Sequence, residues 1–300
     1  MTKDFTLDKL MMVGINYKKT PLEIRERVSF TLNNIEDAYQ KIKQDNVLKE
    51  AVIISTCNRS EICAVVNNSK EDKEYLTGFY SDFFNIKDIE LNEHIVFRSK
   101  EDLIKYLFEG TCGFHSMVLG EDQVLGQIKE SYKTSIKCKA SGKILSRLFL
   151  DSVAVAKKVK ALTGISKNPV SVSTIGVKLI ERKLTDISTK TALVIGLSEM
   201  NRITIQNLIT RDIKTIYVTN RTRRRCQDFS KQFPDIIQLD FKDRYNIIGD
   251  VDIIVSCTAA PHNIITKDKF LEYYKNQPLC VLDLAIPRDI DPDIGNIDGV

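Results

Sequence analysis

The sequence has 300 residues, of which 43% are hydrophobic and 28% are charged, and its formal net charge is +4. This length predicts two domains, and the composition predicts a globular, soluble chain and excludes a disordered one. No apolar run approaches the roughly 18 residues that cross a membrane, and the first residues lack the apolar core of a signal peptide. With so mild a net charge, any nucleic-acid binding must come from local basic clusters.

The seven cysteines are odd in number and irregularly spaced. This pattern argues against a disulfide framework and predicts reduced thiols and a cytoplasmic protein. Neither a Cys-x-x-Cys pair nor a His-Glu-x-x-His motif occurs, and there are only three histidines. We therefore expect no metal site.

The first hundred residues alternate between the patterns of strands and of helices. Thr20, Pro21 and Glu23 predict a helix start, with Thr20 as the cap, Pro21 in the first turn and Glu23 completing a capping box. The order strand, helix, strand, strand, helix, strand matches a split βαβ, ferredoxin-like arrangement with an extra helix after the first strand. The predicted strands cover residues 10–16, 51–55, 62–66 and 95–98, and the two later helices cover residues 35–42 and 71–84.

A polar cluster with a cysteine at its centre ends the apolar run at residues 52–54. That run predicts a buried strand, with Cys57 in the turn to the next strand. The positive charge of Arg59 favours the thiolate, which is the reactive form. Most free cysteines are small buried hydrophobes, but in a core Thr56, Asn58 and Arg59 would each need a buried partner. The stretch therefore predicts a nucleophile.

From residue 100 the pattern is helical. The stretch at residues 110–123 that follows is too polar for a core strand and too apolar for a solvated loop. Glu121 or Asp122 favours the start of the next helix. Gln123 and Gln127 share a face of that helix. Together with Ser116 these side chains could converge on one polar ligand. The alternative, helix capping plus surface glutamines, is favoured by these residues taken alone.

A basic helical region follows at residues 137–160. Most lysine runs are solvated helix faces. If the chain binds a nucleic acid, such a face would contact its phosphates and make binding sensitive to salt. The basic residues are Lys137, Lys139, Lys143, Arg147, Lys157, Lys158 and Lys160.

Three motifs, in this order, resemble those of the glutamyl-tRNA reductase family. Residues 14–18 and 25–30 resemble its opening motif, Thr-Cys-Asn-Arg-x-Glu at 56–61 resembles its catalytic signature, and residues 116–127 resemble its substrate-binding segment. The resemblance implies that Cys57 is the nucleophile and that Arg59 pairs with the glutamyl carboxylate. The residues that it implies for holding the glutamyl end are Thr56, Asn58, Arg59, Ser116, Glu121, Asp122, Gln123 and Gln127.

Two positions depart from the family pattern. The family usually has a histidine in His-Leu-Phe, where this chain has Tyr106, and His115 stands where the family usually has aspartate. Tyr106 could hydrogen-bond the substrate but is too weakly acidic to shuttle protons as imidazole does. His115 could substitute for the family histidine. Packing is the alternative role for both residues, and it is slightly favoured for His115.

Gly164 and the Asn168-Pro169 pair mark a boundary, after which residues 170–183 predict a helix. A strand at 191–196, a turn and a helix through residue 209 then predict the start of a dinucleotide-binding unit. The Gly-x-Gly-x-x-Gly pattern keeps only Gly196, with Ser198 and Asn201 in the other two places, and is weak evidence alone.

The strand at 215–219 ends in Asn220 and arginines, where NAD-binding units usually carry an acidic residue. Arginines suit a 2′-phosphate, so we expect NADPH; a plain basic helix start is disfavoured by the helix dipole. The expected cofactor-binding residues are Gly196, Leu197, Ser198, Glu199, Met200, Asn201, Asn220, Arg221, Thr222 and Arg223. Strands are also expected at 251–256, whose exit would lie near the nicotinamide, and at 280–284.

The resemblance extends from about residue 10 to about residue 298. It implies an α/β protein with a ferredoxin-like catalytic, glutamyl-binding domain with added helices at residues 1–165 and a Rossmann-like NADPH-binding domain at 166–300. It further implies reduction of glutamyl-tRNA to glutamate-1-semialdehyde with release of tRNA, through a Cys57 thioester, as the first step of tetrapyrrole biosynthesis. The cofactor domain would swing or close onto Cys57, with residues near Gly164 as the hinge.

Family members continue into a helical region that joins a homodimer, so we expect this chain to be truncated. Glutamate-1-semialdehyde aminotransferase is an expected partner, and a membrane is not. Two alternatives remain open from the sequence. One is a shikimate-dehydrogenase-like NADP oxidoreductase that needs neither the cysteine nor tRNA. The other is a non-catalytic tRNA-binding regulatory protein.

Overall fold

The computed structural model describes residues 7–56, 58–67, 71–87, 91–116, 118, 120–163, 165, 171–231, 233 and 236–300. The chain divides into two compact units, Met1–Pro169 and Val170–Val300. Within the described ranges, none of the helices is both long and apolar enough to cross a membrane.

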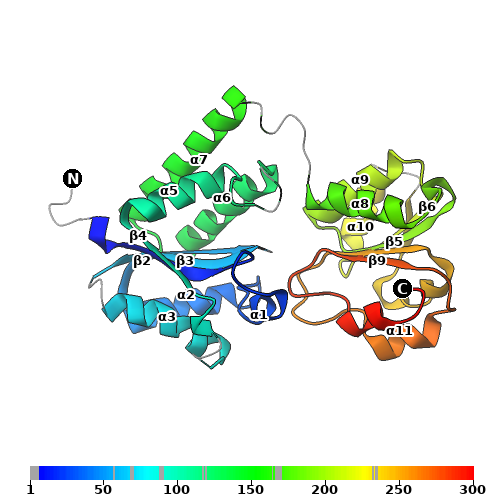
Figure 1. The fold of residues 1–300 in the computed structure, drawn as a ribbon, viewed down its shortest axis with the longest axis horizontal. Coiled ribbons are helices and arrows are strands. Elements are labelled where there is room, and N and C mark those ends of the chain that lie inside the picture. Colours follow the sequence, from blue (N-terminus) through cyan, green and yellow to red (C-terminus); the bar gives the residue numbers. More distant parts are fainter. Residues whose placement is uncertain are drawn as a thin grey trace. The chain divides into compact units, whose positions relative to one another are not determined.

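The first unit contains a four-stranded antiparallel sheet with the strand order β2-β3-β1-β4 and helices on both faces (Figure 1). This is the strand order of the split βαβ arrangement, so the ferredoxin-like prediction is confirmed. Its elements are β1 (Leu10–Asn16), α1 (Leu22–Arg27), α2 (Ile35–Asp45), β2 (Leu48–Thr56), β3 (Arg59–Val66), α3 (Glu71–Phe84), β4 (Val96–Ser99), α5 (Lys100–Thr111), α6 (Asp122–Lys137) and α7 (Lys143–Thr163).

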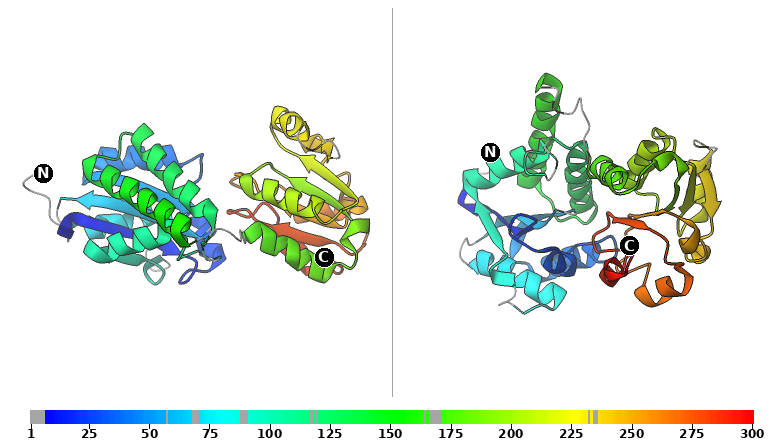
Figure 2. Two further views of the ribbon diagram at one scale, coloured as in Figure 1. Left: turned by 90° about the horizontal axis from the view of Figure 1, so that it is seen from above. Right: turned by 45° about the vertical axis from the view of Figure 1, so that its right-hand side comes forward.

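Two cores enclose this sheet, because successive side chains of a strand point to opposite faces. Met11 and Val13 of β1 join the core on the side of α2 and α3, with Tyr39 fully buried among them. Met12 joins the other core, where Phe149 of α7 packs with residues of α5 and α6. The added helices α5, α6 and α7 therefore cover the face that α2 and α3 leave open, as the two views of Figure 2 also show.

The helix start predicted at Thr20 is wrong in its details. Helix α1 begins at Leu22, and Pro21 occupies the N-cap with an extended ψ of 159° and no side-chain cap bond. Thr20 is 3% exposed, and its carbonyl accepts a hydrogen bond from Arg25 Nε at 3.2 Å. Burial of Thr20 against the rest of the unit took precedence over the local capping pattern.

The second unit contains a five-stranded parallel sheet with the order β7-β6-β5-β8-β9. In chain order this is 3-2-1-4-5, the order of a dinucleotide-binding sheet, so the Rossmann-like prediction is confirmed. Strand β7 and the helices α10 and α11 were not predicted as elements. The elements are α8 (Val172–Lys183), β5 (Thr191–Ile195), α9 (Glu199–Ile209), β6 (Thr215–Thr219), α10 (Arg223–Ser230), β7 (Ile236–Leu239), β8 (Ile253–Ser256), α11 (Lys267–Tyr273) and β9 (Cys280–Asp283).

The order of strands fixes where this unit can bind a ligand. The strand order runs outward from β5 to β7 on one side and from β8 to β9 on the other, so it reverses between β5 and β8. In such sheets the ligand-binding crevice lies beyond the carboxyl ends of the two strands at this point. Gly196 N donates to Thr219 O at 2.8 Å, and Cys257 N donates to Ile195 O at 3.1 Å. The ends of β5, β6 and β8 thus meet at one edge of the sheet.

Candidate active site

The hairpin between β2 and β3 carries the predicted catalytic signature. Thr56 of β2 is paired with Arg59 of β3, so residues 57 and 58 connect the two strands. Cys57 itself lies outside the described residues. Asn58 is 7% exposed; its N–H donates to Thr56 Oγ1 at 3.1 Å, and its carbonyl accepts from Tyr17 N at 2.8 Å. The turn is therefore held by the segment that resembles the family's opening motif.

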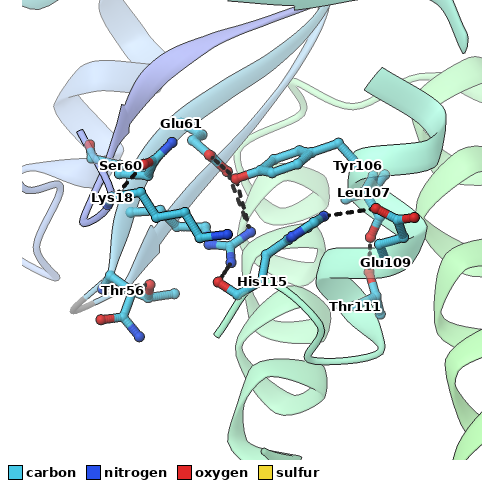
Figure 3. A network of polar contacts seen from close by, with 12 residues as sticks. Lys18, Thr56, Ser60, Glu61, Tyr106, Leu107, Glu109, Thr111 and His115 are labelled. Carbon is cyan, nitrogen blue, oxygen red and sulfur yellow. Dashed lines mark hydrogen bonds and ion pairs between the residues drawn. The ribbon is translucent and has the colours of Figure 1, made fainter. Parts of the chain in front are cut away.

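Arg59 connects this hairpin to the helical part of the unit. It is 6% exposed, and its Nη1 donates to the Tyr106 hydroxyl at 3.3 Å while its Nη2 donates to the His115 carbonyl at 3.1 Å. Figure 3 shows Tyr106 and His115 side by side in this network. The residues of the catalytic signature and those at the start of the predicted substrate-binding segment are thus brought into contact.

Glu61 completes the network, although it was not among the predicted site residues. Its Oε1 accepts a hydrogen bond from the Tyr106 hydroxyl at 2.5 Å, and its Oε2 lies 3.8 Å from Arg59 Nη1. Burial raises the pKa of Glu61 against the opposing charge of Arg59. The signal in the sequence was its place in the catalytic signature directly before the apolar run 62–66, where a buried carboxylate requires a partner.

Tyr106 is a hydrogen-bonding group in this site, because burial and the nearby charge of Glu61 raise its pKa and keep the phenol protonated. Its ring stacks against the His115 ring, with centroids 4.9 Å apart, and the Arg98 guanidinium lies 4.1 Å from the ring centroid. The ring is thus fixed by packing and the hydroxyl by hydrogen bonds.

His115 lies against Tyr106 and within reach of a second carboxylate. Its Nε2 is 3.0 Å from Glu109 Oε2. Burial lowers the pKa of His115, against the effect of the bond to Glu109, and the nearby charges of Arg59 and Lys18 lower it further. Lys18 extends toward the network from the segment after β1 (Figure 3). The surroundings of His115 therefore favour the neutral imidazole.

The predicted substrate-binding segment runs from the end of α5 into α6. Ser116 and Glu121 are buried, while Gln123 and Gln127 are half-buried, which argues against surface glutamines. Within the described part of the chain, Ser116 Oγ and Gln123 Nε2 are buried and have no hydrogen-bond partner. Leaving such atoms unpaired is costly, so they suit a polar ligand. Asp122 begins α6, and its side chain is outside the description.

In the second unit, the turn after β5 requires a glycine, because the residues that follow β8 pack directly against it. Gly196 has φ +93°, and a Cβ there would lie 2.5 Å from the Cys257 carbonyl oxygen. Ser198 caps α9 by accepting from Asn201 N at 3.2 Å. Asn201, in the place of the third glycine, is fully buried, and its amide donates to the carbonyls of Ile195 and Gly196 at 2.8 and 3.0 Å. Asn201 thus supports the turn from inside.

The remaining predicted residues of this turn differ in their surroundings. Leu197 is 8% exposed and belongs to the core of the unit. Glu199 is exposed in the first turn of α9, and the Met200 carbonyl accepts from the hydroxyls of Ser173 and Thr204. Helix α9 begins directly after this turn with Ser198 as its N-cap, and helix starts bind phosphate groups in nucleotide sites.

The predicted 2′-phosphate residues follow β6. A hollow of about 450 Å³ is lined by Asn220, Arg221, Arg223 and Lys242, among others. The acidic residues Asp240 and Asp243 also line it, and Asp240 Oδ1 lies 3.8 Å from Arg223 Nε. Thr222 is the N-cap of α10. Among the described residues, three cationic and two acidic side chains therefore line this hollow.

Asp289 is a buried carboxylate that sequence reasoning missed. It accepts from Ser256 Oγ at 2.7 Å and from Thr258 N and Oγ1 at 2.7 and 2.5 Å. Asp289 therefore fixes the exit of β8 at the same edge as Gly196. Among the described side chains, no group of three His, Cys, Asp or Glu residues is arranged to hold a metal ion.

Comparisons with known proteins agree with this division. The family model described as "Glutamyl-tRNAGlu reductase, N-terminal domain" matches residues 13–163, and that of "Shikimate / quinate 5-dehydrogenase" matches residues 178–300. Glutamyl-tRNA reductase of Alkaliphilus metalliredigens is 40% identical over 97% of this chain and 69% of its own length, and that of Clostridium novyi is 37% identical over 97% and 70%. The solved glutamyl-tRNA reductase of Methanopyrus kandleri is 27% identical with a TM-score of 0.51, over 98% of this chain and 70% of that one.

Proposed function

The chain belongs to the glutamyl-tRNA reductase family, and on that premise we propose that it reduces glutamyl-tRNA to glutamate-1-semialdehyde with NADPH. Its relatives carry out the first step of tetrapyrrole synthesis, and its second unit is similar to dehydrogenases that use a nicotinamide cofactor. The observation that carries the proposal is the contact of Arg59 with both Tyr106 and His115, which joins the signature around Cys57 to the segment with unpaired polar atoms.

The first step is acyl transfer to Cys57. The thiolate attacks the ester carbonyl that joins glutamate to tRNA, so that a C–S bond forms, the C–O bond breaks and the freed tRNA hydroxyl takes a proton. The charge of Arg59, two residues away, favours the thiolate. Arg59 uses two of its five N–H groups on Tyr106 and His115, which leaves donors for the glutamyl carboxylate.

The other proposed glutamyl contacts supply hydrogen bonds and shape. Ser116 Oγ and Gln123 Nε2 lack partners among the described residues and are placed to bind polar groups of the substrate. Thr56 and Asn58 hold the hairpin, and Glu121, Asp122 and Gln127 complete the proposed set. Tyr106 holds Arg59 and Glu61 together and does not shuttle protons.

In the second step NADPH, when bound, would supply the hydride that reduces the thioester carbonyl. Breaking of the C–S bond would then release the aldehyde and the Cys57 thiolate. Residues of the turn from Gly196 to Asn201 would hold the pyrophosphate. Arg221 and Arg223, with Asn220 and Thr222, would hold the 2′-phosphate, which selects NADPH over NADH.

Four further proposals rest on the family. Residues 1–165 form the catalytic, glutamyl-binding domain, and residues 166–300 form the cofactor domain. The full-length protein is a homodimer. An aminotransferase takes up the reactive semialdehyde. The protein works in the cytoplasm, and this is supported by the free thiols of the six described cysteines.

The test is product formation by the purified chain with glutamyl-tRNA and either NADPH or NADH. We expect semialdehyde with NADPH, much less with NADH, and none without the tRNA substrate. Oxidation of shikimate with NADP, unaffected by alkylation of Cys57, would favour the shikimate-dehydrogenase alternative, whose family model matches only the second unit. Binding of glutamyl-tRNA without acylation or NADPH consumption would favour a regulatory protein.

A further inference from the structure

A lysine far along the chain holds the predicted substrate-binding segment. Lys160, near the end of α7, is half-buried, and its Nζ donates to the Gly120 carbonyl at 2.9 Å and to the Glu121 carbonyl at 3.4 Å. Hydrogen bonds from an ammonium group are stronger than neutral ones. The Lys160 ammonium group thus donates to backbone carbonyls, whereas the ammonium group of a lysine on a solvated helix face is bound by water.

The segment that Lys160 holds is closed tightly on itself. Gly120 N donates to the Gly113 carbonyl at 3.1 Å, and a Cβ on Gly113 would lie 3.0 Å from Gly120 Cα. Gly120 has φ +75°, and a Cβ there would lie 2.7 Å from Ile165 Cγ1. There is thus no space for the loop to shift toward the end of α7.

Two cations hold this loop at different points. Arg59 donates to the His115 carbonyl at 3.1 Å, and Lys160 donates to the carbonyls of Gly120 and Glu121. Between and just beyond these points lie Ser116 and Gln123, whose unpaired polar atoms suit a substrate. A cation beside the N-terminus of a helix is disfavoured by the helix dipole. At Lys160 the hydrogen bonds to the carbonyls of Gly120 and Glu121 offset this cost.

We propose that Lys160 is a positioning residue for the acyl-transfer step, and that it holds Gly120 and Glu121, at the start of α6, in the place that lets the neighbouring Ser116 and Gln123 receive the glutamyl group. The proposal rests on the proposed function. It removes Lys160 from the basic residues expected to contact tRNA phosphates, because its donors already serve the loop.

The test compares Lys160→Met with Lys160→Arg, which keeps the charge and the donors. Lys133→Met is the matched control, since the Lys133 side chain is 71% exposed on α6 and pairs with Glu130 three residues away. Three quantities are measured on the whole chain: amide hydrogen exchange of residues 113–127 without substrate, the rate of label transfer from saturating glutamyl-tRNA to the protein, and the salt dependence of binding to uncharged tRNA.

We expect Lys160→Met to exchange faster in residues 113–127 and to be acylated about 10- to 100-fold more slowly, as the loss of charged hydrogen bonds implies. Affinity for uncharged tRNA and its salt slope should stay as in the wild type. Lys160→Arg should recover most of the acylation rate, and Lys133→Met should behave as the wild type. If Lys160→Met does not fold, Lys160→Gln serves in its place.

Two results would overturn the proposal. One is an unchanged acylation rate with a salt slope reduced by about one, because that is the mark of a lost phosphate contact. The other is hydrogen exchange in residues 113–127 that is the same in Lys160→Met as in the wild type. This would show, without any substrate, that Lys160 does not hold the segment. A wild-type chain that is never acylated refutes the proposed function, while the exchange comparison still tests Lys160.

Discussion

The hydroxyl of Tyr106 offers the sharpest test of the buried network. Tyr106→Phe removes one oxygen and keeps the ring that stacks on His115 and lies under Arg98. It deletes the 2.5 Å bond to Glu61 and the 3.3 Å bond from Arg59. The side chains of Glu61 and Arg59 are only 4% and 6% exposed. Each therefore stays buried in the variant with one hydrogen bond fewer.

The expected loss of stability is about 2–3 kcal/mol, because a hydrogen bond to a charged group contributes about 1.5–3 kcal/mol net. For a unit of this size, about 1 kcal/mol shifts the midpoint of thermal unfolding by roughly 2–4 °C, so the shift should be about 4–12 °C. The chain has no tryptophan, so far-UV circular dichroism is the suitable readout.

Tyr75→Phe is the matched control in the same unit. Its hydroxyl also donates to a carboxylate, Asp45 Oδ2 at 2.8 Å, but at an exposed site. Water replaces that bond, so the loss should stay within about 0.5 kcal/mol. Equal shifts for the two variants would refute the argument that burial of the Glu61 network gives the Tyr106 hydroxyl its importance.

Three further predictions concern other parts of the chain. Burial raises the pKa of Asp283 to about 6 from 3.8, so the stability that it contributes is fully present below pH 3.8 and is lost as the pH rises through 6. The free energy of unfolding of Asp283→Asn, measured in urea relative to the wild type, should therefore rise by roughly 3 kcal/mol from pH 4 to pH 7. A stability difference between the two proteins that does not vary with pH would contradict this. Glu50 accepts from the N–H groups of Ile144 and Leu145 at the start of α7, so Glu50→Ala should cost about 2–3 kcal/mol and Glu50→Gln about half as much in thermal unfolding; equal losses would exclude the capping role. Arg221→Glu should raise KM for NADPH more than about tenfold and leave KM for NADH within about twofold, and an equal effect on both cofactors would place the 2′-phosphate elsewhere.

Local patterns predicted the elements well wherever packing and propensity agree. The strand at residues 10–16, the helix at 71–84 and the strand at 215–219 have the expected bounds. Gly196 has the positive φ and close backbone contact that the nucleotide-binding pattern requires. The capping box at Thr20 failed because burial of that side chain is a tertiary effect.

The contacts that shape the candidate site could not be predicted from the sequence. Tyr106 and Glu61 are 45 residues apart, and Lys160 and Gly120 are 40 apart, so no local pattern pairs them. A carboxylate in a buried strand and one lysine among many are weak signals on their own. The sequence identified which motifs matter, and the fold shows which side chains hold them in place.

The central claim is that Cys57 accepts the glutamyl group. The most direct measurement is mass spectrometry of the peptide containing Cys57 after acid quenching of a single turnover with glutamyl-tRNA and no NADPH. We predict a thioester adduct on Cys57 that disappears when NADPH is added, and no adduct in Cys57→Ser. An adduct on another residue, or turnover to semialdehyde by Cys57→Ser, would contradict the account.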